Sequence, residues 1–254
     1  MPSKLLANDE TAPVTIYKKG GTSPLLLVAD HAANLIPRAL GDLGVSESER
    51  ARHIGWDIGI ANVSKHLADA LDAVLILQNY SRLVIDCNRP PGVPSSMPEV
   101  SEATPVPGNV GLSEADKAAR IADIFQPYHA AIKVELDRRQ SNGKPVALIA
   151  MHSFTPFLKG VARPWHIGLL YNRDVRLSQS LLTLLRQEPD LVVGDQEPYT
   201  VDDQTDYTIP VHGEQRRLHH TAIEIRQDLI ADETGQQKWA ALLARLLPQA
   251  YRGL

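Results

Sequence analysis

The 254-residue sequence contains one cysteine, Cys87, so it can form no intrachain disulfide and cannot bind zinc through several thiolates. It also has no excess of basic residues, and its formal charge of −4 at pH 7 offers no cationic field for nucleic acid. No apolar run approaches the roughly 18 residues of a membrane span, and no apolar segment follows the early lysines as in a signal peptide. These absences predict a soluble, cytoplasmic protein that binds neither nucleic acid nor membrane.

Short apolar segments alternate with longer helical patterns along the chain. Hydrophobic residues make up 43% of the sequence, which is enough for a sizeable buried core. Apolar segments of strand length cover residues 24–30, 74–77, 83–86, 146–151, 167–171 and 221–225. Helical patterns cover residues 58–71, 113–139, 177–186 and 236–251, the second of which begins with a capping motif at Ser113 and Asp116. This alternation predicts one α/β domain over residues 1–254, with a mostly parallel sheet between helices.

Six prolines fall between residues 90 and 107, among serines, a glycine and glutamates. Such a composition predicts an irregular loop. Because polar residues suited to chemistry lie on both sides of it, we interpret it as an insertion over a site and not as a linker between domains.

Polar side chains stand at the carboxyl ends of several predicted strands. His31 and His152 directly follow two of them, and Glu224 lies inside a late apolar segment. Similar positions are held by Asp30, Asp86, Asn88 and Arg89. Ligands of parallel sheets bind at this edge. One such histidine alone is more often a hydrogen-bonded core residue, but two histidines with carboxylates supply the ligands of a catalytic zinc ion, which keeps one position open for water.

Six segments of the chain resemble the N-formylglutamate amidohydrolase family. They are VADHAANLIP (28–37), HIGWDIG (53–59), SRLVIDCNRP (81–90), MHSFTP (151–156), GDQEPY (194–199) with VHG (211–213), and IEIRQDLI (223–230). Each is short, but they occur in the family's order and are spread from residue 28 to residue 230, so the resemblance spans most of the chain.

The resemblance implies a zinc-exopeptidase-like fold, a three-layer α/β/α sandwich with a mixed, mostly parallel sheet and one zinc ion. It also implies hydrolysis of N-formylglutamate or a related N-acyl amino acid to formate and the free amino acid, an activity associated with histidine degradation. His31 and His152 then correspond to metal ligands, Asp57 to the third ligand, and Glu224 to the general base toward water. Two alternatives stay open, since Asp57 could stabilise a helix N-terminus and Glu224 could pair with Arg226.

The remaining site predictions concern support of the metal and binding of the substrate. His53 lies four residues before Asp57, so on one helix both would face the same way, and His53 is a candidate supporting residue or alternative ligand. Asp30 is a second candidate for either role. Arg82 and Arg89 are candidate clamps for two substrate carboxylates. The other candidate substrate-binding residues are Asn88, Arg226 and His212, the last as a donor to the developing oxyanion.

Three other functions compete with this interpretation. A non-catalytic zinc or small-anion module on the same fold would use the same histidines without turnover. A zinc amidase for another peptide-like amide would share every motif and differ in loops 90–107 and 195–217. A nucleophilic hydrolase based on Ser153 or Cys87 is disfavoured, because no Gly-x-Ser-x-Gly motif occurs and a thiol in an apolar segment is usually inert.

Overall fold

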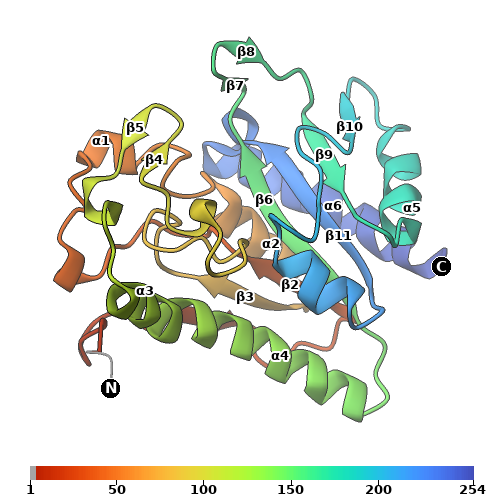
Figure 1. Cartoon of the computed structure of the whole chain (residues 1–254). Helices are drawn as coiled ribbons and strands as arrows, with labels where there is room; N and C mark the ends of the chain where they lie inside the picture. The colour runs from red at the N-terminus through yellow and green to blue at the C-terminus, as the bar shows by residue number, and fades with distance from the viewer. Residues whose placement is uncertain (1–3) are drawn as a thin grey trace.

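The computed structural model of the chain describes residues 4–254 and centres on a seven-stranded β-sheet (Figure 1). The strand order is β1-β3-β2-β6-β11-β9-β10. The bounds are β1 (Val14–Tyr17), β2 (Leu25–Ala29), β3 (Val74–Gln78), β6 (Ala147–Phe154), β9 (Ile167–Leu170), β10 (Val193–Asp195) and β11 (His219–Arg226). Strands β3, β2, β6 and β11 run parallel to one another, whereas β1 and the β9–β10 pair run antiparallel to their neighbours. The predicted mixed, mostly parallel sheet is confirmed.

Helices cover both faces of this sheet (Figure 1). Their bounds are α1 (Glu47–Arg50), α2 (Ile60–Leu71), α3 (Glu114–Arg120), α4 (Gln126–Ser141), α5 (Arg176–Leu185) and α6 (Glu233–Arg252). Side chains of α2, α5 and α6 pack on one face with Leu25 and Leu27, and those of α4 pack on the other with Leu26 and Val28. Successive residues of a strand point to opposite faces, so a strand buried on both must be apolar throughout. The three-layer α/β/α architecture is thereby confirmed.

The predicted helix over residues 113–139 is present but contains a change of pitch. Ser113 forms a capping box with Asp116, and a π-helical turn at Ile121–Phe125 joins α3 to α4. Within residues 4–254, no helix combines the length and the apolar character that a membrane span requires.

The predicted strand over residues 83–86 is wrong. Leu83, Val84 and Ile85 are fully buried, as their apolar character indicates, but their backbone forms a turn. The polar groups of this buried loop find partners outside any sheet: the Asn109 amide donates to the carbonyl of Leu83, and the Arg120 guanidinium donates to that of Val84. A buried backbone needs partners for its polar groups, not a particular secondary structure.

Two small hairpins lie outside the main sheet. The proline-rich segment 90–107 is irregular apart from the pair β4 (Val100–Ser101) and β5 (Thr104–Pro105), and β7 (Phe157–Leu158) pairs with β8 (Val161–Ala162) beyond β6. Strand β6 runs further than residue 151, so His152 lies within it, opposite Glu224 of β11. This register places an imidazole and a carboxylate side by side on neighbouring parallel strands.

Candidate metal and amide-binding site

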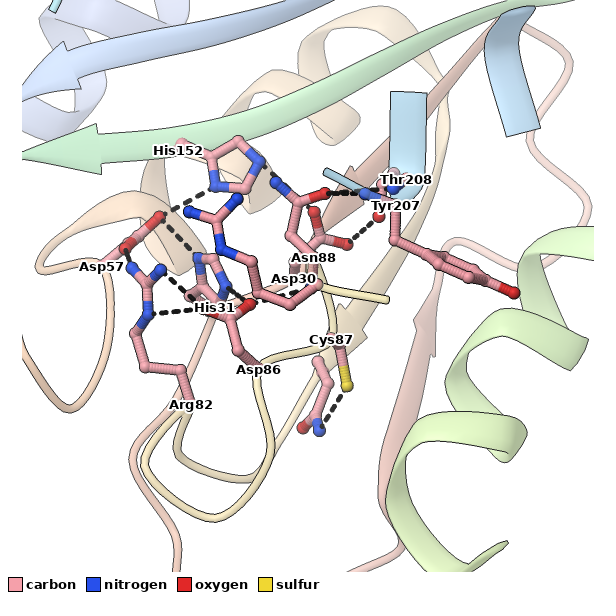
Figure 2. Close-up of polar contacts among 12 residues, drawn as sticks. Asp30, His31, Asp57, Arg82, Asp86, Cys87, Asn88, His152, Tyr207 and Thr208 are labelled. Atoms are coloured by element: carbon pink, nitrogen blue, oxygen red, sulfur yellow. Dashed lines mark hydrogen bonds and ion pairs between the residues drawn. The ribbon is translucent and has the colours of Figure 1, made fainter. Parts of the chain in front are cut away.

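Three buried side chains converge at the carboxyl ends of β2 and β6 (Figure 2). His31 follows β2, His152 lies in β6, and Asp57 lies before α2. One ligand atom from each of the three lies within 4.8 Å of the other two. Asp57 Oδ2 is 3.4 Å from His31 Nδ1 and 3.1 Å from His152 Nδ1. Ligand atoms about 2.0–2.2 Å from a tetrahedral zinc ion stand roughly 3.3–3.6 Å apart, so this donor set fits zinc.

The backbone around Asp57 fixes its carboxylate between the histidines. The Asp57 amide donates to the His31 carbonyl at 2.9 Å, and the Ser153 amide donates to Asp57 Oδ2 at 3.3 Å. Asp57 lies in the irregular segment just before α2. It does not share a helix with His53, which the prediction that both residues face the same way had required. His53 instead points to Glu102, with Nε2 3.1 Å from Oε1, and lies outside the His31–Asp57–His152 group. The structure therefore does not bring His53, the predicted supporting residue or alternative ligand, into this group.

Two further carboxylates orient the histidine rings from behind (Figure 2). His31 Nε2 lies 2.7 Å from Asp86 Oδ1, and His152 Nε2 lies 3.3 Å from Asp30 Oδ2. Asp30 is itself held by the Thr208 hydroxyl at 2.8 Å. With each Nε2 facing a carboxylate, both Nδ1 atoms face Asp57, which is the carboxylate–histidine arrangement that supports metal ligands. Asp30 thus contacts a ligand and does not belong to the ligand group.

The charges around the three residues favour a bound cation. Burial raises the pKa of Asp57, but the two histidines and their hydrogen bonds outweigh it and hold that pKa well below the usual range. Burial lowers the pKa of His152, yet the hydrogen bonds to Asp30 and Asp57 raise it well above the usual value. Buried carboxylates that draw a proton onto an imidazole would equally draw a metal cation.

Glu224 lies beside this group with a free oxygen. It is buried, and its Oε2 has no hydrogen-bond partner among residues 4–254. Burial raises the pKa of Glu224 to about 7, although His152 opposes the shift. The guanidinium of Arg226 pairs with Asp228 instead, so the alternative ion pair between Arg226 and Glu224 does not form. A carboxyl group that lines the cavity and has a pKa near 7 is suited to accept a proton.

A cavity of about 540 Å³ opens above these side chains, a size typical of small-molecule sites. Predicted residues that line it are His31, Asp57, Arg82, Asn88, Arg89, His152 and Glu224.

The two arginines of the cavity differ in their contacts. All three guanidinium nitrogens of Arg82 face carboxylates, since Nε and Nη2 donate to Asp86 and Nη1 donates to Asp57. Arg89 uses only Nη1, which donates to Asp206 and to the carbonyl of Thr205. Arg82 is therefore bound to the metal-supporting carboxylates, and only Arg89 keeps donors free.

Four other predicted residues lie away from the cavity. His212 is buried with Nε2 3.0 Å from His129 Nδ1, and Arg226 contacts Asp228 and two backbone carbonyls. Neither His212 nor Arg226 lines the cavity, although both were predicted as substrate contacts. The Ser153 hydroxyl donates to the carbonyl of Ile58, and burial raises the pKa of the Cys87 thiol well above its usual value. Both arrangements disfavour a nucleophilic mechanism through these residues.

The sequence matches the N-formylglutamate amidohydrolase family over residues 23–231, which is most of the chain. The chain belongs to the N-formylglutamate amidohydrolase family. Membership in this family makes it an amidohydrolase. All residues of the cavity lie within the matched segment.

Two solved structures resemble the whole chain. A gene product from Agrobacterium tumefaciens is 35% identical with a TM-score of 0.95, and the match covers 98% of this chain and 99% of that one. An N-formylglutamate amidohydrolase from Ralstonia eutropha is 20% identical with a TM-score of 0.67, and the match covers 96% of this chain and 100% of that one. The second likeness concerns the fold alone. Among curated proteins, none matches the sequence significantly.

Three residues of this amidohydrolase site were assigned no role from the sequence, although Asp86 was noted at the end of an apolar segment. Asp86 contacts His31 and Arg82, Asp206 contacts Arg89, and Tyr199 lines the cavity. Asp86 and Tyr199 lie in two of the segments that carry the family resemblance, which was the available signal. Asp206 lies in a polar loop that gives no such signal.

Proposed function

We propose that the chain hydrolyses the acyl amide bond of an N-acyl amino acid, with zinc held by His31, Asp57 and His152 and with Glu224 as general base. N-formylglutamate is the first substrate to test, and its products would be formate and glutamate. The observation that carries this proposal is the buried ligand group beside a carboxylate that has a free oxygen. Family membership supports amide hydrolysis as the reaction.

A zinc ion in this group would supply Lewis-acid polarisation of the amide carbonyl and would lower the pKa of water. The chain's own residues move the proton. The Glu224 carboxylate accepts it as water attacks the acyl carbon, and then delivers it to the nitrogen of the departing amino acid. Because the pKa of Glu224 is about 7, its carboxyl group can both accept and return a proton near neutral pH.

Binding of the substrate carboxylate is assigned to Arg89. Its Nη1 is tied to Asp206, which holds the guanidinium against the cavity wall, and its other nitrogens remain available for a carboxylate. Asn88 supports the same wall, because its amide nitrogen donates to Asp206 and its oxygen accepts from the Thr208 amide. We assign Arg82 to holding Asp57 and Asp86 in place, not to gripping the substrate.

The test combines metal analysis with a formate-release assay over N-formyl amino acids. We expect about one equivalent of zinc per chain, and we expect chelators to remove both zinc and activity. The double variant His31→Ala, His152→Ala should lose both. Full activity of that variant without metal would contradict the proposal. Zinc binding without turnover of any N-acyl amino acid would instead support a non-catalytic binding module.

A further inference from the structure

The cavity has two chemically different ends. One end is polar and carries Asn88 and Arg89, which both donate to Asp206. The other end is apolar and is formed by Ala150, Leu170, Val201, Ile209 and Ala222. All five apolar side chains are buried and belong to the same hydrophobic cluster.

Strand register places the apolar end directly beside the reacting groups. Ala150 and Ala222 are paired neighbours on β6 and β11, and Leu170 of β9 pairs with Ala222 on its other side. His152 and Glu224 lie two residues further along the same strands, hence on the same face. The two alanines leave space next to Glu224 that a larger side chain would fill. The sheet thus presents an apolar recess one step away from the ligand group and the free carboxyl oxygen.

The charges of the cavity can neutralise one substrate carboxylate. Four carboxylates line it (Asp57, Asp202, Asp206 and Glu224), against two guanidinium groups, of Arg82 and Arg89. Arg82 is occupied by Asp57 and Asp86, so Arg89 is the lining cation with unused donors among residues 4–254. A second carboxylate in the apolar recess would lose its hydration without gaining a cation.

We propose that the preferred substrate is an N-acyl amino acid with a single carboxylate, bound by Arg89, and an apolar group buried against Ala150, Leu170, Val201, Ile209 and Ala222. This inference rests on the proposed function. It states that a substrate with one carboxylate is preferred to a dicarboxylate such as N-formylglutamate. The apolar group can belong to the amino-acid side chain or to the acyl chain, and both chemistries fit the same recess.

The test compares kcat/KM of the zinc-loaded enzyme for four amides. N-formylleucine carries the apolar group on the amino acid, N-isovalerylglycine carries it on the acyl side, N-formylglutamate has a second carboxylate, and N-formylglycine has neither feature. We expect one of the two apolar substrates to exceed N-formylglutamate by about 10- to 200-fold, the discrimination that apolar contacts usually supply. Whichever of the two is faster identifies the group that fills the recess.

Two variants separate the recess from general stability. Val201→Ala should lower kcat/KM for the faster apolar substrate about tenfold, with a smaller loss for N-formylglycine. Val45→Ala is the matched control, because Val45 is also buried in the same hydrophobic cluster but does not line this cavity. Val45→Ala should leave kcat/KM unchanged for both the faster apolar substrate and N-formylglycine.

The outcomes distinguish the two proposals. If N-formylglutamate is hydrolysed as fast as the apolar substrates or faster, the recess inference is overturned while the proposed function stands. If the zinc-loaded enzyme hydrolyses none of the four amides, both are overturned. The wild-type comparison needs no variant, so it remains decisive even if Val201→Ala does not fold.

Discussion

At the scale of single residues, the site depends on where each carboxylate lies relative to its partners. Asp57, Asp86 and Asp30 all lie beside histidines or arginine that hold their pKa values low, whereas the pKa of Glu224 is raised. Burial acts on every one of these groups, but only Glu224 lacks enough compensation to keep a low pKa. The difference in partners separates three positioning carboxylates from one proton acceptor.

The first prediction concerns this acceptor. Glu224→Gln keeps the size of the side chain but cannot take a proton, so we expect kcat to fall by about 10²–10⁴. Zinc content should stay near that of the wild type, since Glu224 is outside the ligand group. Steady-state kinetics and metal analysis on the same preparation check both points. A kcat near the wild-type value would assign Glu224 a structural role.

A second prediction concerns Asp86, which orients His31 through Nε2. Asp86→Asn removes the charge that faces the ring and weakens the contact with Arg82, so zinc affinity should fall about 10- to 100-fold. Competition with a chromophoric chelator measures this change. Asp69→Asn, at an exposed carboxylate that bonds Tyr17, is the control and should leave affinity unchanged. Equal affinity in both variants would contradict the supporting role of Asp86.

The sequence singled out the three residues of the candidate metal group more readily than it placed the residues around the cavity. His31 and His152 could be chosen because they follow apolar segments and match family motifs, and Asp57 could be chosen because it matches a family motif. Arg82 could not be distinguished from Arg89, because the sequence does not show that the turn at 82–86 folds the Arg82 guanidinium back onto Asp86. The burial of His212 against His129 depends on contacts between segments 83 residues apart, which no local pattern reveals.

At the scale of elements, the loop over residues 81–86 is the least regular part of the site and yet is buried. It carries Arg82 and Asp86, and its apolar residues led to the incorrect strand prediction. Three apolar residues followed by a polar one fit a buried strand and a buried turn equally well. What distinguishes them is the partner of each carbonyl, and here those partners are Asn109 and Arg120, far along the chain. Long amphipathic helices such as α2 and α6 have no such ambiguity, and their predicted bounds lie within three residues of the observed ones.

A third prediction tests this support. Arg120 is buried on α3 and donates to the Val84 carbonyl, the Asn109 side chain and the Gly108 carbonyl. Arg120→Ala leaves these acceptors unpaired, so the free energy of unfolding should fall by about 2–4 kcal/mol. Urea titration measures the change. Arg138→Ala, on the exposed face of α4 where it pairs with Glu135, should cost less than about 1 kcal/mol. Similar losses in the two variants would show that Arg120 does not hold the loop.

At the scale of the whole molecule, a buried histidine pair joins α4 to the segment that closes the back of the cavity. His129 Nε2 lies 2.8 Å from the Cys87 carbonyl and donates to it, so its Nδ1 accepts from His212 Nε2 at 3.0 Å. Both rings are neutral in this arrangement. The pair connects the helical layer, the loop after residue 86 and the π-helical turn Thr208–Glu214, whose first residue holds Asp30. Proton uptake here would therefore disturb three segments that surround the site.

The last prediction follows from the neutrality of this pair. Burial lowers the pKa of His129 to about 4, while the charge of Asp30 opposes the shift only in part. An unfolded chain has a histidine pKa near 6.5, so between about pH 6.5 and pH 4 it binds a proton that the folded chain does not. The contribution of His129 to the free energy of unfolding is then fully present above pH 6.5 and is lost as the pH falls through this window. Relative to His129→Gln, the wild type should lose on the order of 2 kcal/mol of unfolding free energy between pH 7 and pH 5.

Urea titrations at several pH values, with a chelator present throughout, isolate this difference because the titration of His31 and His152 is common to both proteins. Lys133→Gln, on the exposed face of the same helix, should keep the wild-type slope. A His129→Gln slope identical to that of the wild type would mean that the pair binds a proton in the folded state, and that His129 does not link acid to unfolding.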